Sequence, residues 1–600
     1  CLVGSEMCIR DRYRLFLLAT FITGLTSCSD WLEPEPLSFY TPENGVKDVN
    51  GIETVLQVSR RQLKNEYYGN QDEQIAQIEY ILSDMAISGA PEDYELHNLE
   101  TQLTPTLIKG KQRVYKHFSH AWGGIKYANL VINRIPQIEA SQEKKDELLA
   151  EGYFHLAYWY YRLVNQFGDV PLILEEIQEP RIDLQSTSRE AILKYFCEKL
   201  EFAVEHLPMT APAGAINRAA GEHLLTKYYL QCRRFDDAVK SATRCIENYG
   251  LKLMKNRFGI RANDQIHDVI NDLFKEENIT ASENLEGILT VQEQFGSEGS
   301  VSPSEGSCRM RLYTPYWSGP QVRTPDGMGG YSKANAIVQM DSLGRGIGIV
   351  RPTNYYQYEL WKDCGNDMRH NSLNWYDAKH YTYTNPQSAY FRKSIQPEYI
   401  TGHDTIRCYY SWPYYKVFVD KDEINKGNEP KGGFTDWYVF RLAETYLLRA
   451  EAYYWQNKLP EALADVNEIR QRANAPLYQS VGLDEIFDER ARELYLEEPR
   501  KCELTRVAYI KAALGQDGYT LDKMHEKNWY YDRVIAKNNF YRNEISHGTN
   551  SYKIKPYHVY WPIPQDAIDA NNLNVINQNY GYQGSQNNIP PLETVVEPEK

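Results

Sequence analysis

The sequence lacks the signatures of the common catalytic and metal-binding sites. Its 600 residues contain no His-Glu-x-x-His, no Gly-x-Ser-x-Gly, no Walker phosphate loop and no EF-hand loop. Positive charge is scarce as well, because 66 Lys and Arg oppose 81 Asp and Glu, for a net charge of −15. Nucleic-acid binding needs the opposite sign, since it neutralises phosphates. We therefore expect no catalytic residues, no cofactor, no metal site and no nucleic-acid partner.

Cysteine pairs at diagnostic spacing are also missing. The chain has 10 cysteines but no Cys-x-x-Cys, and an odd number of them follows Cys28. This spacing predicts neither a disulfide framework nor a zinc site. Most of these cysteines are expected to be buried small apolar residues on helices.

Long hydrophobic runs are absent too, and the mean hydropathy of −0.60 excludes a polytopic membrane protein. The apolar run 15–25 is shorter than the roughly 20 residues that cross a bilayer, and arginines precede it. This pattern predicts a secretory signal within residues 1–27. Residues 1–12 resemble translated sequencing-adapter sequence, so we expect them to form no part of the fold.

The run ends in Leu-Thr-Ser-Cys28, which resembles a bacterial lipobox. Cleavage at such a signal leaves the cysteine as an acylated N-terminus, so Cys28 is the expected lipidation site. An ordinary signal with a chance cysteine is the alternative. Residues 28–44 are acidic and broken by proline, as in a tether before a folded body.

Helical periodicity dominates two regions of a chain too long for one simple domain. In residues 45–251, one apolar stripe with spacings of three and four runs from Leu149 to Phe167. Helical hairpins with small residues at their crossings are predicted at 218–249 and again at 438–472, within the region 436–600. Both fit the tetratricopeptide pattern. A mainly α, helical-repeat scaffold is therefore predicted.

The intervening residues 252–435 are rich in glycine, proline and aromatic residues without helical period, and we interpret them as a loop-rich insert. The whole chain has 47 Tyr, against 18 Phe and 11 Trp, and tyrosine suits surfaces where one ring edge stays wet. Tyr313, Tyr316 and Trp317 lie within five residues of the insert. They could form a platform for the apolar face of a sugar, or close a small core beneath the loops.

The helical segments resemble the SusD/RagB family of outer-membrane lipoproteins of Bacteroidetes. The resemblance rests on residues 122–130, on residues 151–172 with their Gly-Asp-Val-Pro-Leu exit, and on residues 441–452 and 467–473. It continues through residues 489–506, 561–564 and 578–582, in family order. One departure is Pro499, where the family usually has glycine before the arginine; no change of fold is expected from it.

The resemblance implies about four tetratricopeptide-like helix pairs that dock against a SusC-like TonB-dependent transporter. It also implies a non-catalytic, surface-exposed lipoprotein of the outer membrane that binds oligosaccharides and hands them to that transporter. The acidic residues after Cys28 look like the family's signal for surface display. A lipid-anchored glycoside hydrolase and a tetratricopeptide adaptor that binds peptides remain the alternatives.

Family sites draw on the loop after the first helices and on the central insert, so position alone selects the expected ligand-binding residues. The expected residues are Asp84, Tyr94, His97, Asn98, Tyr313, Tyr316, Trp317 and Tyr331.

Overall fold

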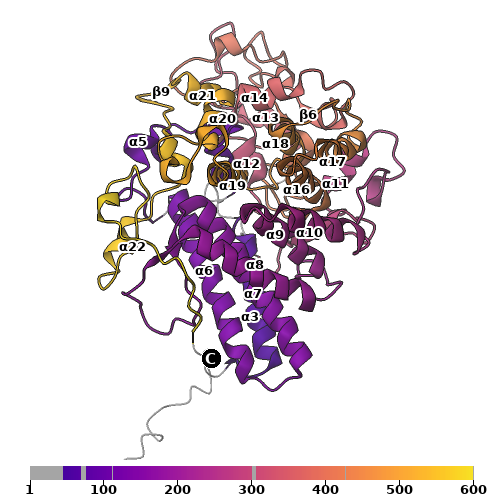
Figure 1. Ribbon diagram of the computed structural model, residues 1–600. Coiled ribbons are helices and arrows are strands. Elements are labelled where there is room, and N and C mark those ends of the chain that lie inside the picture. The colour runs from indigo at the N-terminus through magenta and orange to yellow at the C-terminus, as the bar shows by residue number, and fades with distance from the viewer. Residues whose placement is uncertain are drawn as a thin grey trace, which may run out of the picture.

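The computed structural model describes residues 45–68, 76–92, 94–110, 112–300, 306–425 and 427–598 (Figure 1). The predicted signal region, Cys28 and the tether 28–44 lie outside the described residues. None of the described helices combines the length and the apolar character that a bilayer crossing requires.

Eight described helices form the scaffold, and each packs against the next in a continuous series. The series is α3 (Val49–Lys64), α6 (Arg113–Arg134), α7 (Gln142–Phe167), α8 (Arg189–His206), α9 (Arg218–Gln231), α10 (Phe235–Glu247), α16 (Leu442–Trp455) and α17 (Leu459–Arg472). Taken two at a time they make four helix pairs, which confirms the predicted tetratricopeptide-like scaffold.

Local sequence explains where these helices begin and end. Ser141 and Ser188 accept hydrogen bonds from the first-turn amides of α7 and α8, and both are favoured N-cap residues. Gly168 ends α7 with a positive φ of 70°, which glycine adopts at little cost. The hairpin predicted from residue 438 begins later than expected, because residues 437–441 form a strand.

The two predicted hairpins are separated in sequence but adjacent in space. Helix α10 packs against α16, and Arg449 donates a hydrogen bond of 3.1 Å to the hydroxyl of Thr243. Strand β4 (Gly287–Val291) pairs antiparallel with β8 (Trp437–Arg441), so the chain leaves the scaffold and returns to it at one place. The insert therefore interrupts the helical series without breaking its packing.

The insert consists mainly of loops and short elements, as predicted, and occupies the half of the molecule opposite the N-terminal helices (Figure 1). Its helices are α11 (Val269–Phe274), α12 (Arg309–Tyr313), α13 (Lys333–Leu343), α14 (Asn354–Gln357) and α15 (Tyr414–Val417), and its short strands are β5 (Val350–Pro352), β6 (Trp375–Tyr376) and β7 (Trp412–Pro413). Strand β5 pairs with β1 (Ala86–Ser88) from the N-terminal region, and β6 pairs with β7.

The C-terminal region returns across both halves. Its elements are α18 (Leu483–Glu493), α19 (Arg500–Ala513), α20 (Trp529–Lys537), α21 (Asn539–Arg542), β9 (Ser546–His547), β10 (Asn550–Ser551) and α22 (Gln565–Asp569). The Trp561 amide donates 2.6 Å to the carbonyl of Gln166, and Asn579 donates to the carbonyls of Phe167 and Trp561. The segment from Trp561 to Asn579, called the closing segment, is thereby fixed to the end of α7, where β2 (Val170–Pro171) pairs with β3 (Ser186–Thr187).

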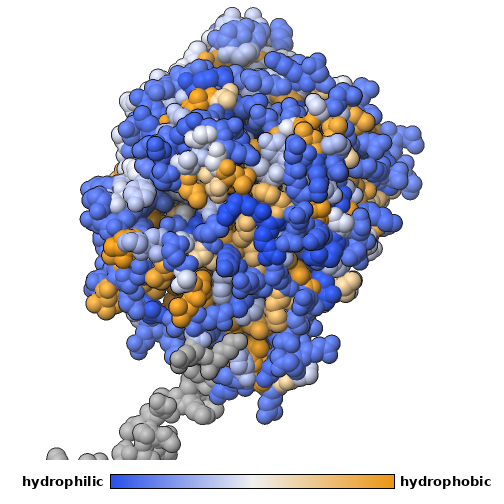
Figure 2. Space-filling view, in the orientation of Figure 1, coloured by the Kyte–Doolittle hydropathy of each residue, from blue (hydrophilic) through white to orange (hydrophobic). Residues whose placement is uncertain are grey.

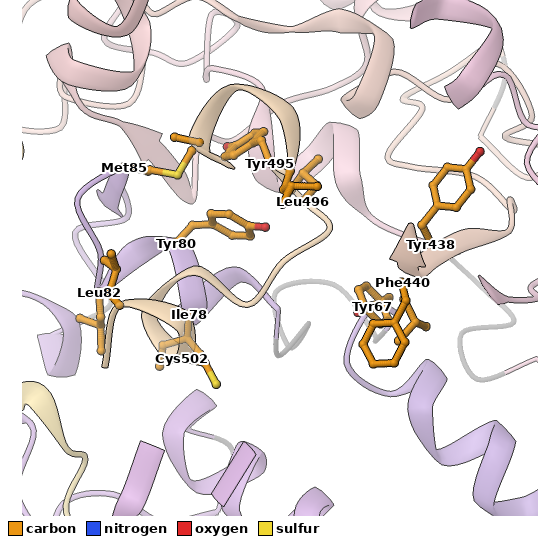
Figure 3. Close-up of a cluster of buried hydrophobic side chains, with 14 of the residues drawn as sticks. Tyr67, Ile78, Tyr80, Leu82, Met85, Tyr438, Phe440, Tyr495, Leu496 and Cys502 are labelled. Atoms are coloured by element: carbon orange, nitrogen blue, oxygen red, sulfur yellow. The ribbon is translucent and has the colours of Figure 1, made fainter. Parts of the chain in front are cut away.

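Tyrosine contributes much of the core, as the cluster of buried side chains around Tyr80, Tyr438 and Tyr495 illustrates (Figure 3). The ring of Tyr80, on α4 (Gln77–Ile81), packs edge-on against Tyr495 at 5.0 Å between centroids. Its hydroxyl donates 2.7 Å to the carbonyl of Glu498. Tyr228 and Tyr438 donate to the carbonyls of Ala157 and Leu273 in the same way, also at 2.7 Å.

A buried backbone carbonyl without a hydrogen-bond donor is costly in free energy. These tyrosines fill the core with their rings and supply that donor with their hydroxyls. Toward solvent the chain is largely hydrophilic on the face that Figure 2 shows, with apolar residues reaching the surface between the helices.

A buried network of ion pairs joins insert and scaffold at Glu493, the last residue of α18. Arg369 of the insert lies 2.9 Å from one carboxylate oxygen, and Arg441 lies 2.8 Å from the other, which also contacts Arg472. Lys416 of the insert donates to the Glu493 carbonyl at 2.6 Å. All of these side chains are buried. Because the three guanidinium groups compensate one carboxylate and its neighbours, the pKa of Glu493 is well below its usual value even though burial acts to raise it.

Replacing Glu493 should therefore be strongly destabilising. The substitution Glu493→Gln removes the one carboxylate that three buried guanidinium groups share, although Arg369 keeps Asp367 and Arg441 keeps Glu497 as partners. Breaking a buried pair costs about 3–5 kcal/mol. We expect the free energy of unfolding in urea to fall by about that amount. Glu461→Gln on the exposed side of α17 is the matched control and should change it little. Equal stabilities of the two variants would contradict the role given to Glu493.

Candidate functional site

The loop after the first helices and the central insert meet in the structure, as the site prediction requires. Strand β1 pairs with β5, and the Gly89 amide donates 2.7 Å to the carbonyl of Ile349. A Cβ at Gly89 would lie 2.1 Å from the Gly348 carbonyl oxygen, so only glycine permits this approach. The loop that carries Glu92 is thereby held against the insert.

Arg407 organises the surface where the two segments meet. Its Nη2 lies 2.7 Å from Asp404 Oδ2, Nε donates to both oxygens at 3.0 Å, and Nη1 donates 3.2 Å to the Ile347 carbonyl. The guanidinium lies 5.1 Å from the ring centroid of Tyr316, whose amide donates 2.8 Å to the Arg407 carbonyl. Glu92, with 62% of its side chain exposed, lies 3.7 Å from Arg407 on the outer side. The half-buried Tyr316 ring is thus fixed beside a paired guanidinium and an open carboxylate.

Asp404 connects this surface to the interior. Nε2 of His547 lies 3.5 Å from Asp404 Oδ1, and Nδ1 lies 3.0 Å from the Tyr552 hydroxyl. Burial acts to raise the pKa of Asp404, but interactions with His547 and Arg407 outweigh it and lower the pKa. Asp404 is therefore ionised at neutral pH and keeps Arg407 in place.

The three ring residues Tyr316, Trp317 and Tyr331 lie together, but they are not equally accessible. Trp317 is only 2% exposed and stacks on Tyr381 at 5.8 Å between centroids, with Tyr331 at 6.5 Å. Tyr331 and Tyr316 are half-buried. The pKa of Tyr331 is raised, first by burial and then by Glu429, while Arg345 acts in the opposite direction. Trp317 supports the neighbouring rings from below, which corrects its expected role as an open platform.

Asp84 and Tyr313 lie elsewhere in the core. Asp84 is fully buried, 2.8 Å from Nη2 of Arg500 and 2.7 Å from Nε of Arg533, and these cations hold its pKa far below the usual value against the effect of burial. Tyr313 is 2% exposed and packs edge-on against Tyr495. Residues distant in sequence enclose both side chains, so neither is exposed at the surface as the sequence argument expected, and ligand contact by either stays a prediction.

The remaining predicted residues flank the contact between loop and insert. His97 is buried, and its ring packs against those of His547 and Tyr552 at 5.2 and 5.0 Å. Asn98 precedes α5 (Leu99–Gln102) and forms a backbone bridge with Lys553. Tyr94 begins the short helix η3 (Tyr94–Leu96), but its side chain lies outside what the structure describes. His97 thus belongs to the support beneath Asp404.

Three tyrosines on the outer side of the insert were missed by the sequence argument. Tyr358 is 55% exposed, Tyr399 is 37% exposed, and Tyr409 is half-buried. The Tyr399 carbonyl accepts a hydrogen bond of 3.2 Å from the amide of Arg323, and the Thr401 amide donates 3.0 Å to the carbonyl of Gln321. Their flanking residues share no pattern that would have found them: Tyr358 lies between Gln and Glu, whereas Tyr409 lies between Cys and Tyr.

A ring-lined hollow of about 790 Å³ lies on the scaffold, where α7 ends and the closing segment returns. Tyr580 at its edge is 59% exposed, and its ring centroid lies 5.3 Å from that of His525. Its other ring side chains are Tyr509, Tyr557 and Tyr560. A hollow of about 770 Å³ beside α3 and α7 has no aromatic lining, and one of about 350 Å³ in the insert includes the stacked rings of Tyr414 and Phe418.

Metal chemistry has no support among the residues that the structure describes, where no group of three or more His, Cys, Asp or Glu side chains is arranged to hold an ion. The surface where the loop after β1 meets the insert presents aromatic rings, amides, the fixed guanidinium of Arg407 and the exposed carboxylate of Glu92. Such a set suits a ligand with apolar faces and many hydroxyl groups.

Comparison with known proteins connects this geometry to a family. Residues 300–582 match the model described as the SusD family, and residues 30–230 match the model described as starch-binding associating with outer membrane. The starch-binding protein SusD of Bacteroides thetaiotaomicron is 30% identical over 193 residues, which are 32% of this chain and only 29% of that protein. A SusD-like protein of Formosa agariphila is 22% identical over 582 residues, or 91% of this chain and 94% of the relative.

Solved structures share the fold. Surface glycan-binding protein A from Bacteroides thetaiotaomicron, solved in complex with laminarihexaose, superposes with a TM-score of 0.61 at 16% identity. The match covers 89% of this chain and 100% of that protein.

The burial of Trp317 leads to a prediction that separates support from ligand contact. Trp317→Ala should lower the free energy of unfolding by about 3–5 kcal/mol, because it opens a large cavity next to Tyr381 and Tyr331. Urea unfolding measures this effect. Tyr358→Ala at an exposed position is the control and should cost less than about 0.5 kcal/mol. A Trp317→Ala protein as stable as this control would show that the ring is not part of the core.

Proposed function

The chain belongs to the SusD/RagB family, and we propose that it captures oligosaccharides through the outer side of its insert. The proposed site is the insert surface, defined here as Glu92, Tyr316, Gln321, Tyr331 and Arg407. The protein acts as a surface-exposed lipoprotein of the outer membrane, acylated at Cys28. It delivers its ligand to a SusC-like TonB-dependent transporter and does not cleave it.

The observation that carries this proposal is the fixed position of Tyr316 beside Arg407, which also contacts Glu92 of the loop after β1. A pyranose presents an apolar C–H face to an aromatic ring and a rim of hydroxyls to carboxylate, amide and guanidinium groups. Tyr316 and Tyr331 supply the rings, and Glu92 supplies an exposed acceptor beside Arg407. The Gln321 amide donates 3.4 Å to Asp404 Oδ2 and helps to hold that carboxylate. Arg407 is already paired with Asp404, so the site is organised before a ligand arrives.

A hydrolytic role receives no support from the same surface. Glycoside hydrolysis needs a carboxylic acid whose pKa is raised so that it can protonate the leaving group. Asp404 is the carboxylate closest to Arg407, and its pKa is lowered instead. Binding without bond cleavage is the function that this electrostatic arrangement favours.

The ring residues give the sharpest test of the binding site. Tyr316→Ala combined with Tyr331→Ala should weaken binding to the best ligand of a soluble glycan panel, which includes laminarihexaose and malto-oligosaccharides, by about tenfold or more, or about 1.4 kcal/mol. Isothermal titration calorimetry measures the loss. Both rings are half-buried at the edge of the core, so thermal unfolding of the double variant is measured alongside to separate lost ligand contact from lost folding.

Tyr580→Ala is the matched control on the scaffold hollow and should leave the affinity unchanged. Loss of binding in Tyr580→Ala alone would move the site to that hollow. Unchanged affinity in every variant would favour internal packing of these rings, as a peptide-binding adaptor implies. Sustained release of reducing sugar by the unmodified protein would instead support the hydrolase.

The lipid anchor and the transporter partner can be tested together in a bacterium that makes relatives of this protein, such as Bacteroides thetaiotaomicron. Cys28→Ala should move the protein from the membrane fraction into the soluble fraction, because an acyl chain is needed for stable attachment. Cys364→Ala, which removes a thiol of the insert, should leave it in the membrane. Mild detergent extraction of the unmodified protein should also recover a large β-barrel transporter. A Cys28→Ala protein that stays in the membrane would contradict the lipid anchor.

A further inference from the structure

Two of the cysteines meet in the scaffold although their spacing predicts no disulfide. The Sγ atoms of Cys197 on α8 and Cys232 at the end of α9 lie 3.1 Å apart. Cys197 is buried, and Cys232 is half-buried. We propose that these two thiols are oxidised to a disulfide in the exported protein, an inference that rests on the proposed surface location only for its oxidising environment.

The backbone around the pair permits the bond. A disulfide needs its sulfur atoms about 2.05 Å apart, so the two side chains have to approach by about 1 Å from the reduced positions. Cys232 is the C-terminal cap of α9, with φ −75° and ψ 0°, and Arg233 follows in the left-handed region with φ 59°. The chain at Cys232 has therefore already left the regular helix, and a small shift there does not break the α9 ladder.

The surroundings indicate which thiol reacts first. The pKa of Cys197 is raised, first by its hydrogen bond with Cys232 and then by burial, while Arg234 acts in the opposite direction. Cys232 is the more accessible thiol, and a thiolate is the attacking species in disulfide exchange. Cys232 is therefore the thiol that meets an oxidant, and Cys197 is the thiol that completes the bond.

The reaction balances with an exported protein disulfide of the thioredoxin-like class as oxidant. The Cys232 thiol loses its proton to solvent, and the resulting thiolate attacks one sulfur of the oxidant. A mixed disulfide forms, and the second oxidant sulfur leaves as a thiolate. Cys197 then loses its proton, attacks Sγ of Cys232 and expels the first oxidant sulfur. Two protons are released, two electrons pass to the oxidant, and one intramolecular S–S bond remains.

The bond would brace a junction of the scaffold. Helices α8 and α9 belong to consecutive helix pairs, and α10 after the cross-link packs against α16 beyond the insert. A cross-link between residues 197 and 232 closes a loop of about 35 residues in the unfolded chain, which lowers its entropy. Two other buried thiols have backbone partners instead: Cys245 donates to the Ala219 carbonyl and Cys408 to the Asp404 carbonyl.

The test is peptide mapping of the protein purified from outer membranes, denatured and alkylated without reductant. We expect the peptides that contain Cys197 and Cys232 to be recovered as one cross-linked species, lighter by two hydrogen atoms than the sum of the free peptides. Reductant should separate them and lower the thermal midpoint of the protein. Cys232→Ala should lose the cross-link and the response to reductant, whereas Cys364→Ala should keep both.

A second arm distinguishes the chemistry from the location. Purified full-length protein with all thiols reduced is incubated with oxidised glutathione and mapped in the same way. Formation of the Cys197–Cys232 bond is expected, and this result does not depend on export or on glycan binding. Alkylation of both thiols in the membrane-derived protein, or in the folded protein after this oxidation, would overturn the proposal.

Discussion

The buried carboxylate of Glu493 is the point on which insert and scaffold both depend. Three arginines from different parts of the chain converge on it, with Arg369 from the insert, Arg441 from strand β8 and Arg472 from α17. Each charge is expensive to bury alone, and the cost is offset only when all partners are present. The network therefore favours one relative placement of insert and scaffold, because any other arrangement separates Arg369 of the insert from Glu489 and Glu493 of α18.

The proposed binding surface follows from this placement. The chain passes between scaffold and insert at the paired strands β4 and β8, and the insert also meets the loop after β1 through β5. The Tyr316 ring contacts Arg407, which is held by Asp404, and Asp404 in turn contacts His547 of the C-terminal region. Segments distant in sequence therefore position the ring, rather than its own loop. A preorganised ring and fixed charges reduce the entropy lost when a flexible saccharide binds.

Local sequence predicted the scaffold well, because helix periodicity, serine caps and small residues at crossings are encoded within each segment. The stripe from Leu149 to Phe167 and the two hairpins are found as helices. The individual site residues could not be predicted in the same way. Asp84, Tyr313 and Trp317 have polar or aromatic side chains in apparent loops, but their burial is decided by residues hundreds of positions away, such as Arg500 and Tyr495. Tyrosine in particular serves the core and the surface alike, because its hydroxyl can pair with a backbone carbonyl or with water.

The account is tested most directly by a crystal structure of the protein with the oligosaccharide that binds it most tightly in a glycan panel. We predict a sugar ring against Tyr316 and Tyr331, with hydroxyls in contact with Glu92 or Arg407. An oligosaccharide bound in the hollow beside Tyr580, with the insert surface empty, would contradict the account.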